Sequence, residues 1–197
     1  VTTFNEQTIP NLEDGMKAAT EKTGVSAPKG FILDLRNNPG GLLSIAISVT
    51  DLFLDQGEIV STRDREGKGE RYKASKGDIA KGKPMIILIN AGSASASEIV
   101  AGALQDHQRA IVLGTKSFGK GSVQSVLPMG QSGGIRLTTA RYYTPSGRSI
   151  QALGVTPDVF LEFKRVEEKE EEKRRTFSEA DLEGALSNDS LADSEKE

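Results

Sequence analysis

The sequence predicts an α/β protein: a core of alternating strands and helices, followed by a β-rich annex. Up to residue 114, short apolar runs alternate with segments whose apolar residues recur at helical spacing. Between residues 122 and 150 the pattern changes to short β-type runs that glycine and proline interrupt. The chain has 197 residues, enough for one ordinary core, so we expect a domain over residues 1–161 and a charged extension over residues 162–197.

The N-terminal part of the chain predicts a helix and then a strand. Apolar side chains recur every three or four residues from Ile9 to Ala19, and Gly24 follows as a stop signal. This pattern predicts a helix over residues 10–23. The short apolar run at residues 31–35 predicts the first strand of the core.

A sharp turn is expected directly after this strand, because residues 37–41 read Asn-Asn-Pro-Gly-Gly. Residues 42–54 are apolar over one broad face and predict a helix. Residues 58–62 predict another strand. Residues 63–83 are rich in Lys, Gly and Glu, so we expect them to form an exposed excursion.

The second half of the core begins with the apolar run at residues 84–90, which predicts a buried strand. A turn of small residues follows, then a helix that starts near Ser95, and residues 110–114 predict a further strand. In the annex, residues 123–127 and 135–139 have the composition typical of strands.

Composition excludes several classes of function. The net charge is −3 and no basic stripe with interleaved aromatic residues is present, so we expect no nucleic-acid partner. Cysteine is absent and only one histidine is present, which excludes a disulfide, a cysteine nucleophile and a multi-histidine metal site. We expect neither a metal nor a cofactor. No apolar run is long enough to span a bilayer.

The two ends of the chain differ from the core. The start at Val1 has neither a basic leader region nor a methionine, so we expect an excised or processed segment. A charge run over residues 162–175 precedes a polar end with one short helical pattern at residues 178–186. We expect this extension to be partly helical and solvated, or disordered.

The most informative stretch is Ser93-Ala94-Ser95-Ala96-Ser97-Glu98, which follows the strand at residues 84–90. A serine at a helix N-terminus lies where backbone N–H groups point outward, as a nucleophile requires. The spacing of Ser95 and Glu98 also fits a capping box, in which the serine only caps the helix. A cap needs one serine rather than three, and the alanines leave room for another backbone to approach. Ser93 and Ser97 are alternative nucleophiles by this argument.

A serine hydroxyl needs a base within about 2.6–3.2 Å to become a nucleophile. His107, the only histidine, lies twelve residues after Ser95 on the same expected helix. At 1.5 Å per residue this places His107 roughly 18 Å along the helix axis. We therefore interpret His107 as a surface or capping residue, which disfavours a Ser-His-Asp triad.

Lys120 is the alternative base. A lysine acts as a base only when its amine is neutral, which requires desolvation or nearby positive charge. Glycines flank Lys120 and permit close backbone approach, and Phe118 supplies apolar cover. If residues 121–126 are extended, Gln124 shares a face with Lys120 and can hold the amine in place. The competing interpretation is an exposed, solvated lysine.

The same loop nearly matches a phosphate-binding pattern. Residues 114–120 contain two glycines spaced as in that motif, followed by a lysine. Gly121 stands where the magnesium-binding hydroxyl belongs, and β-type sequence follows in place of a helix. A nucleotide hydrolase is therefore disfavoured.

Together these residues resemble the C-terminal processing peptidases, also called tail-specific proteases, a serine protease family with a Ser-Lys dyad. The matching blocks run in order through the chain: residues 30–41, 93–98, 102–106, 114–124, 141–151 and 154–158. The resemblance implies a ClpP/crotonase-like core. It also implies a catalytic-domain fragment that lacks the N-terminal helical part and the PDZ domain of the family.

The resemblance further implies a role for each matching residue. Ser95 corresponds to the nucleophile, Lys120 to the general base and Gln124 to a supporting residue. The backbone N–H of Ala96 and that of either Gly40 or Gly41 correspond to the oxyanion hole.

The function implied is that of a serine endopeptidase that cleaves protein substrates near accessible, apolar C-terminal tails. The implied compartment is the bacterial periplasm or cell envelope. The oligomeric state is left open, with a homo-oligomer as one alternative. One alternative is an inactive fragment or scaffold of the same fold, in which Ser95 only caps a helix. Another is a crotonase-like enzyme that polarises an acyl thioester, for which no coenzyme-binding residues are identified.

Overall fold

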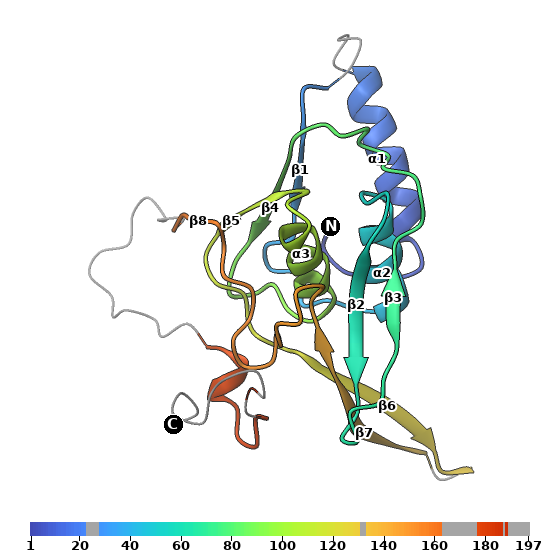
Figure 1. Cartoon of the computed structure of the whole chain (residues 1–197), viewed down its shortest axis with the longest axis vertical. Helices are drawn as coiled ribbons and strands as arrows, with labels where there is room; N and C mark the ends of the chain where they lie inside the picture. The colour runs from blue at the N-terminus through green and yellow to red at the C-terminus, as the bar shows by residue number, and fades with distance from the viewer. Residues whose placement is uncertain (23–27, 131–132, 163–176, 187, 189–197) are drawn as a thin grey trace.

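The structure is a computed structural model that describes residues 1–22, 28–130, 133–162, 177–186 and 188. Two sheets and three helices form the body (Figure 1). The parallel sheet has the order β1 (Phe31–Asp34), β4 (Met85–Ile89), β5 (Ile111–Gly114) and β8 (Val159–Phe160). The antiparallel sheet has the order β3 (Arg71–Lys73), β2 (Glu58–Arg63), β7 (Gly134–Tyr143) and β6 (Ser122–Pro128).

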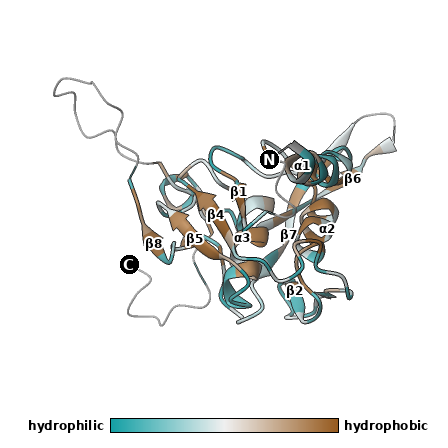
Figure 2. Ribbon diagram, turned by 90° about the horizontal axis from the view of Figure 1, so that it is seen from above, coloured by the Kyte–Doolittle hydropathy of each residue, from teal (hydrophilic) through white to brown (hydrophobic). Residues whose placement is uncertain are grey.

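The three helices are α1 (Thr8–Lys22), α2 (Leu43–Asp51) and α3 (Ala96–Asp106). Seen from above, α3 lies between the parallel strands β4 and β5 on one side and β2 and β7 on the other (Figure 2). Its first nine residues are all buried, as expected for a helix that is apolar around most of its circumference. The core therefore surrounds α3 and fixes its N-terminal end.

The predicted fold class is confirmed: the structure combines a parallel α/β core with an antiparallel, β-rich part. The two sheets interleave along the chain, because β2 and β3 of the antiparallel sheet precede β4, and β8 of the parallel sheet follows β7. Two short strands escaped the sequence analysis. β3 lies within the predicted exposed excursion and is held by antiparallel pairing with β2, although two of its three residues are exposed. β8 contributes two residues that pair with the end of β5. Backbone pairing, rather than an apolar pattern, forms both strands.

The parallel register brings two turns together. β1 and β4 pair from Phe31 with Met85 to Asp34 with Leu88, so their carboxyl ends lie at the same edge of the sheet. Loops that follow neighbouring parallel strands meet at that edge, which is where open α/β sheets place their sites. The glycine turn at residues 37–41 and the serine run at residues 93–97 are the loops concerned.

The N-terminal segment fastens the glycine turn from outside. The N–H of Phe4 donates to the carbonyl of Gly40 at 3.0 Å, and the N–H of Leu42 donates to the carbonyl of Phe4 at 2.9 Å. The side chain of Phe4 is itself buried in the core. Burial of this ring and two backbone hydrogen bonds therefore hold the turn in one conformation.

The predicted charged extension is only partly within the described residues. Apart from Glu162, the charge run at residues 162–175 lies outside them. Where a short helix was expected at residues 178–186, the structure has a single 3₁₀ turn, η2 (Glu179–Asp181). None of the helices that the structure describes has both the length and the apolar character needed to cross a membrane.

Candidate active site

The glycine turn packs directly against the start of α3. A Cβ atom at Gly40 would lie 2.7 Å from the carbonyl oxygen of Ala94 and 2.9 Å from the nitrogen of Ala96. Gly40 also has a φ of +101°, which side chains rarely tolerate. Only glycine therefore permits this approach, and it brings the turn beside Ser95 and Ala96.

The three serines of the run have different surroundings. The Ser93 hydroxyl is buried and donates to the carbonyl of Leu35 at 2.7 Å. The Ser97 hydroxyl is also buried and donates to the carbonyl of Asn38 at 2.9 Å. Ser95 is half-buried. Ser93 and Ser97 join the serine run to the loop after β1, so the geometry favours Ser95 among the three candidates.

Ser95 has a strained backbone. Its φ of +56° and ψ of −113° lie outside the regions that non-glycine residues usually occupy. Such a conformation costs about 1–3 kcal/mol and persists only where the surroundings enforce it. A serine on a strained turn between a strand and a helix is the arrangement that presents a nucleophile in many hydrolases.

Glu98 connects the serine run to the loop of Lys120. Its side chain is fully buried. One carboxylate oxygen, Oε2, accepts the N–H of Ser95 at 2.8 Å and the N–H of Lys120 at 2.9 Å. The other, Oε1, accepts the Ser117 hydroxyl at 2.5 Å and the N–H of Gly119 at 2.7 Å. Both oxygens are therefore saturated by donors from two separate segments.

The shared oxygen brings the two predicted reactive residues together. Two nitrogens bonded to one oxygen at these distances lie under about 6 Å apart, so the backbones of Ser95 and Lys120 are neighbours. Lys120 is half-buried rather than freely solvated. A further bond, from the N–H of Phe118 to the carbonyl of Ser93 at 3.0 Å, ties the same two segments.

Burial of Glu98 has an electrostatic consequence. Desolvation raises the pKa of its carboxyl to about 7, although the hydrogen bonds from Ser117, Ser95, Gly119 and Lys120 act in the opposite direction. A proton on this group would occupy one of four acceptor positions that already face donors. The four donors therefore favour the ionised form, whereas burial, the larger effect, favours the protonated form.

This function of Glu98 is not apparent from the sequence. Of the hydrogen bonds to the Glu98 side chain, the capping-box spacing predicts only the one that the N–H of Ser95 donates, which the structure contains. The bonds to Ser117, Gly119 and Lys120 join residues about 20 positions apart. The only available signal was an acidic residue in the first turn of a helix that is otherwise apolar.

The amides near Ser95 differ in availability. The N–H of Gly40 donates to the Asn38 side-chain oxygen at 2.9 Å. The N–H groups of Gly41 and Ala96 have no acceptor among the residues that the structure describes. Gly41 and Ala96 therefore retain the donors that an oxyanion would need.

Gln124 and His107 are positioned as follows. Gln124 is exposed on β6, and the strand register shifts between Val123 and Gln124. Such an irregularity interrupts the two-residue alternation, so strand periodicity does not place Gln124 on the same face as Lys120.

His107 caps the far end of α3, and its Nε2 lies 2.7 Å from the carbonyl oxygen of Glu58.

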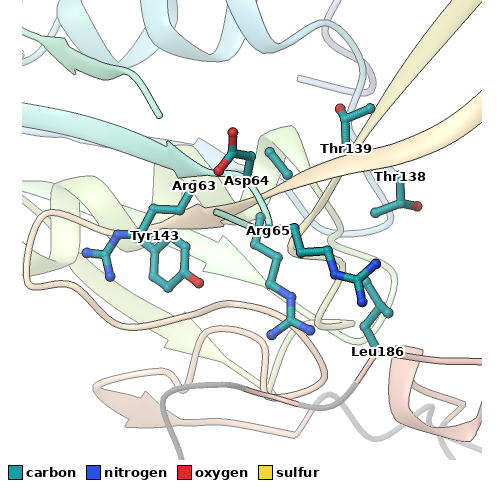
Figure 3. Close-up of a pocket in the computed structure, with 9 residues that line it drawn as sticks. Arg63, Asp64, Arg65, Thr138, Thr139, Tyr143 and Leu186 are labelled. Carbon is teal, nitrogen blue, oxygen red and sulfur yellow. The ribbon is translucent and has the colours of Figure 1, made fainter. Parts of the chain in front are cut away.

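A basic hollow of about 470 Å³ lies between the end of β2 and β7 (Figure 3). Its lining includes Arg63, Arg65 and Arg141, and the Arg63 guanidinium carbon lies 4.1 Å from the centroid of the Tyr143 ring. Arg63 and Arg141 are register partners on adjacent strands. Three arginines and one acidic residue, Asp64, therefore give the lining of the hollow a net positive charge, which favours acidic groups. Over the described ranges of the chain, no group of three or more acidic or histidine side chains could hold a metal ion.

The structure places a serine on a strained turn of an α/β core, with two free backbone amides and the lysine loop beside it. This arrangement is typical of serine hydrolases that bind an oxyanion with backbone N–H groups. Comparison with known proteins makes the class more specific. The chain matches Peptidase family S41 over residues 1–161 and belongs to that family of C-terminal processing serine peptidases.

Relatives described as carboxy- or carboxyl-terminal-processing proteases occur in several bacteria. The chain is 54% identical over 184 residues to the carboxy-terminal-processing protease of Bartonella bacilliformis, covering 93% of this chain and 42% of the relative. It is 49% identical over 133 residues to the carboxyl-terminal-processing protease of Synechocystis, covering 68% of this chain and 31% of the relative.

A solved structure gives the same result for the fold. The photosystem II D1 C-terminal processing protease is 38% identical, with a TM-score of 0.73, over 82% of this chain and 41% of that protein. The chain thus spans less than half the length of these relatives.

Proposed function

We propose that this chain carries the catalytic part of a serine endopeptidase that cleaves proteins near their C-terminus, with Ser95 and Lys120 as a dyad. The observation that supports this proposal most strongly is the Glu98 oxygen that accepts both the Ser95 and the Lys120 N–H. Family membership supports the peptidase class. The strained backbone of Ser95 and the burial of the two neighbouring serines support the choice of nucleophile.

The proposed reaction begins with proton transfer. The unprotonated amine of Lys120 takes the proton of the Ser95 hydroxyl, and the oxygen attacks the scissile carbonyl carbon. The carbonyl π bond breaks as the new C–O bond forms, which leaves a negatively charged oxygen. The N–H groups of Gly41 and Ala96 stabilise this oxyanion; Gly41 is chosen over Gly40, whose N–H already donates to Asn38.

The remaining steps regenerate the enzyme. Lys120 returns its proton to the leaving amine as the C–N bond breaks, and an acyl-enzyme remains on Ser95. Lys120 then deprotonates a water molecule, and the hydroxide formed attacks the ester carbon. Lys120 returns this proton to Ser95 Oγ as the acyl C–O bond to the serine breaks, which releases the second product and restores both residues. Gln124 is assigned a supporting contact to the lysine amine or to the substrate. No metal or cofactor takes part in these steps.

The proposed substrates are proteins with accessible, apolar C-terminal tails, in the periplasm or cell envelope of a bacterium. The relatives from Bartonella bacilliformis and Synechocystis are bacterial proteins, which supports the assignment at the level of the family. A PDZ domain in the longer protein would bind the tail, and the active protein would be a homo-oligomer or a monomer.

Labelling with a fluorophosphonate, followed by mass spectrometry, tests the dyad. Ser95→Ala and Lys120→Ala are expected to abolish labelling and peptide cleavage, and Lys120→Arg to leave both near zero because arginine stays charged. The matched control is Lys116→Ala, an exposed lysine four residues earlier, which should retain the parental rate. Labelling of Lys120→Ala at the parental rate would contradict the dyad.

The alternative function is a scaffold of the same fold, in which Ser95 caps α3. The bond from the Ser95 N–H to Glu98 is the observation that favours it. A capping serine stays unlabelled in the parental chain and in a longer protein that carries the rest of the relatives' length. Labelling of Ser95 in either protein would exclude this alternative.

A further inference from the structure

The part of the chain after the family match packs against the loop of Lys120. This docked segment consists of residues 177–186 and Asn188. The N–H of Glu179 donates to the carbonyl of Phe118 at 3.0 Å, two residues before Lys120. Phe177 and Ser178 line a hollow together with Phe118 and Ser117. The docked segment therefore touches the loop directly on the side that precedes Lys120.

Gln151 connects the docked segment to the other side of the loop. Its side chain is fully buried. The side-chain oxygen accepts the N–H of Gly121 at 3.1 Å, one residue after Lys120. The side-chain nitrogen donates to Oε1 of Glu179 at 3.4 Å and to the carbonyl of Leu186 at 3.3 Å. All of these partners lie either beside Lys120 or on the docked segment.

Asn188 completes the attachment. It is 3% exposed, and its side-chain nitrogen donates to the carbonyls of Ser149 at 3.1 Å and Gln151 at 2.7 Å. The backbone of Ala152 in turn donates to the carbonyl of Gly119 at 2.8 Å. The residues around Gln151 are thus held by the docked segment on one side and hold the Lys120 loop on the other.

The sequence of the loop explains why it needs these restraints. Lys120 lies between two glycines, and Gly119 has a φ of +99°. Glycine has more conformational freedom than any other residue, so the loop alone does not fix the direction of the lysine side chain. Glu98 restrains Gly119 and Lys120, and Gln151 restrains Gly121.

We propose that the docked segment positions Lys120 for catalysis through Gln151, which is a positioning residue of the active site. The inference rests on the proposed function, because it assumes that the direction of Lys120 matters for the reaction. When the segment detaches, the Gln151 nitrogen loses its two acceptors and the amide is free to turn away from Gly121. Gly121 then loses its buried hydrogen bond, and the lysine loop becomes mobile.

Hydrogen exchange tests the physical part of the proposal without an assay of activity. Asn188→Asp keeps the shape of the side chain but removes the donor to Ser149 and Gln151. We expect exchange at the Gly121 amide to rise about 10-fold, and exchange at Gly119, which Glu98 holds, to rise much less. The matched control, Glu183→Gln, changes an exposed carboxylate on the same segment and should leave both amides unchanged.

An exchange of donor and acceptor gives a second test. Gln151→Glu keeps an acceptor for Gly121 but places an oxygen against Glu179 and Leu186, so we expect the labelling rate of Ser95 to fall about 10-fold. Adding Glu179→Gln returns a donor to this contact and should restore part of the rate. For peptide substrates, kcat should fall while KM stays constant, because the lysine and not the binding surface is displaced.

The outcomes separate the two proposals. Equal increases in exchange at Gly119 and Gly121, or no increase in Asn188→Asp, would overturn the role of the docked segment while leaving the dyad intact. A parental chain that shows the expected exchange pattern but never labels Ser95 would support the docking and contradict the proposed function.

Discussion

Replacement of Glu98 by Gln changes one atom at the contact that joins Ser95 and Lys120. The carboxylate accepts four hydrogen bonds, two on each oxygen. An amide nitrogen in place of Oε2 would face the N–H groups of Ser95 and Lys120. In place of Oε1 it would face the N–H of Gly119 and the Ser117 hydroxyl. Either orientation leaves at least one buried backbone N–H without an acceptor.

The structure sets the size of the effect. An unsatisfied buried donor costs about 1–3 kcal/mol, and a bond to a charged group is worth about 1.5–3 kcal/mol. If this free energy is lost from the arrangement of Ser95 and Lys120, the rate of fluorophosphonate labelling falls about 10- to 100-fold. The control is Glu66→Gln, an exposed glutamate whose pairing with Lys68 is at the surface.

The assay compares the labelling rate and the free energy of unfolding of both variants with those of the parental chain. We expect Glu98→Gln to label about 10- to 100-fold more slowly while the unfolding transition stays cooperative, and Glu66→Gln to match the parent. A folded Glu98→Gln variant that labels within about 2-fold of the parental rate would refute the reasoning, since such a factor is under 0.5 kcal/mol.

Three further predictions concern stability. Burial raises the pKa of Glu98 to about 7 from its ordinary 4.5, so the protonated group stabilises the fold below pH 4.5, and that contribution, about 3 kcal/mol, is lost as the pH rises to 7. Urea unfolding at pH 4.5 and pH 8 should show this loss of stability in the parent and not in Glu98→Gln. Parallel pH profiles for the two proteins would contradict the prediction. Gly40→Ala should destabilise by at least about 1–3 kcal/mol and abolish labelling, because its Cβ would meet the Ala94 carbonyl. Gly15→Ala, on the exposed face of α1 with open space around it, should stabilise by about 0.5–1 kcal/mol and keep the labelling rate; destabilisation there would contradict the helical assignment.

Local sequence patterns predicted the elements that carry Ser95. The strand β4, the turn of small residues and α3 follow one another in the chain, and each has its own signal in apolar period or residue size. The Pro-Gly-Gly turn was predicted for the same reason. Its contact with Ala94 and Ala96 follows from the parallel pairing of β1 and β4, which the alternation of strands and helices suggests.

Contacts between distant segments were not predictable in this way. The spacing of Ser95 and Glu98 reveals one hydrogen bond, whereas the three that reach the Lys120 loop depend on how that loop folds back over α3. The shift in register after Val123 has no sequence signal, so the sequence could not show that the two-residue alternation is interrupted before Gln124. The partners of Gln151 were hidden because a charged, polar extension gives no indication that part of it docks.

The central claim is that the Lys120 amine deprotonates the Ser95 hydroxyl. The most direct test is a crystal structure of the phosphonylated protein, determined on a chain with the full length of its relatives. The account predicts phosphorus on Ser95 Oγ, the Lys120 amine within about 3.2 Å of that oxygen, and the phosphoryl oxygen bonded to the Gly41 and Ala96 N–H groups. An adduct on another residue, or a Lys120 amine that points into solvent away from Ser95, would contradict it.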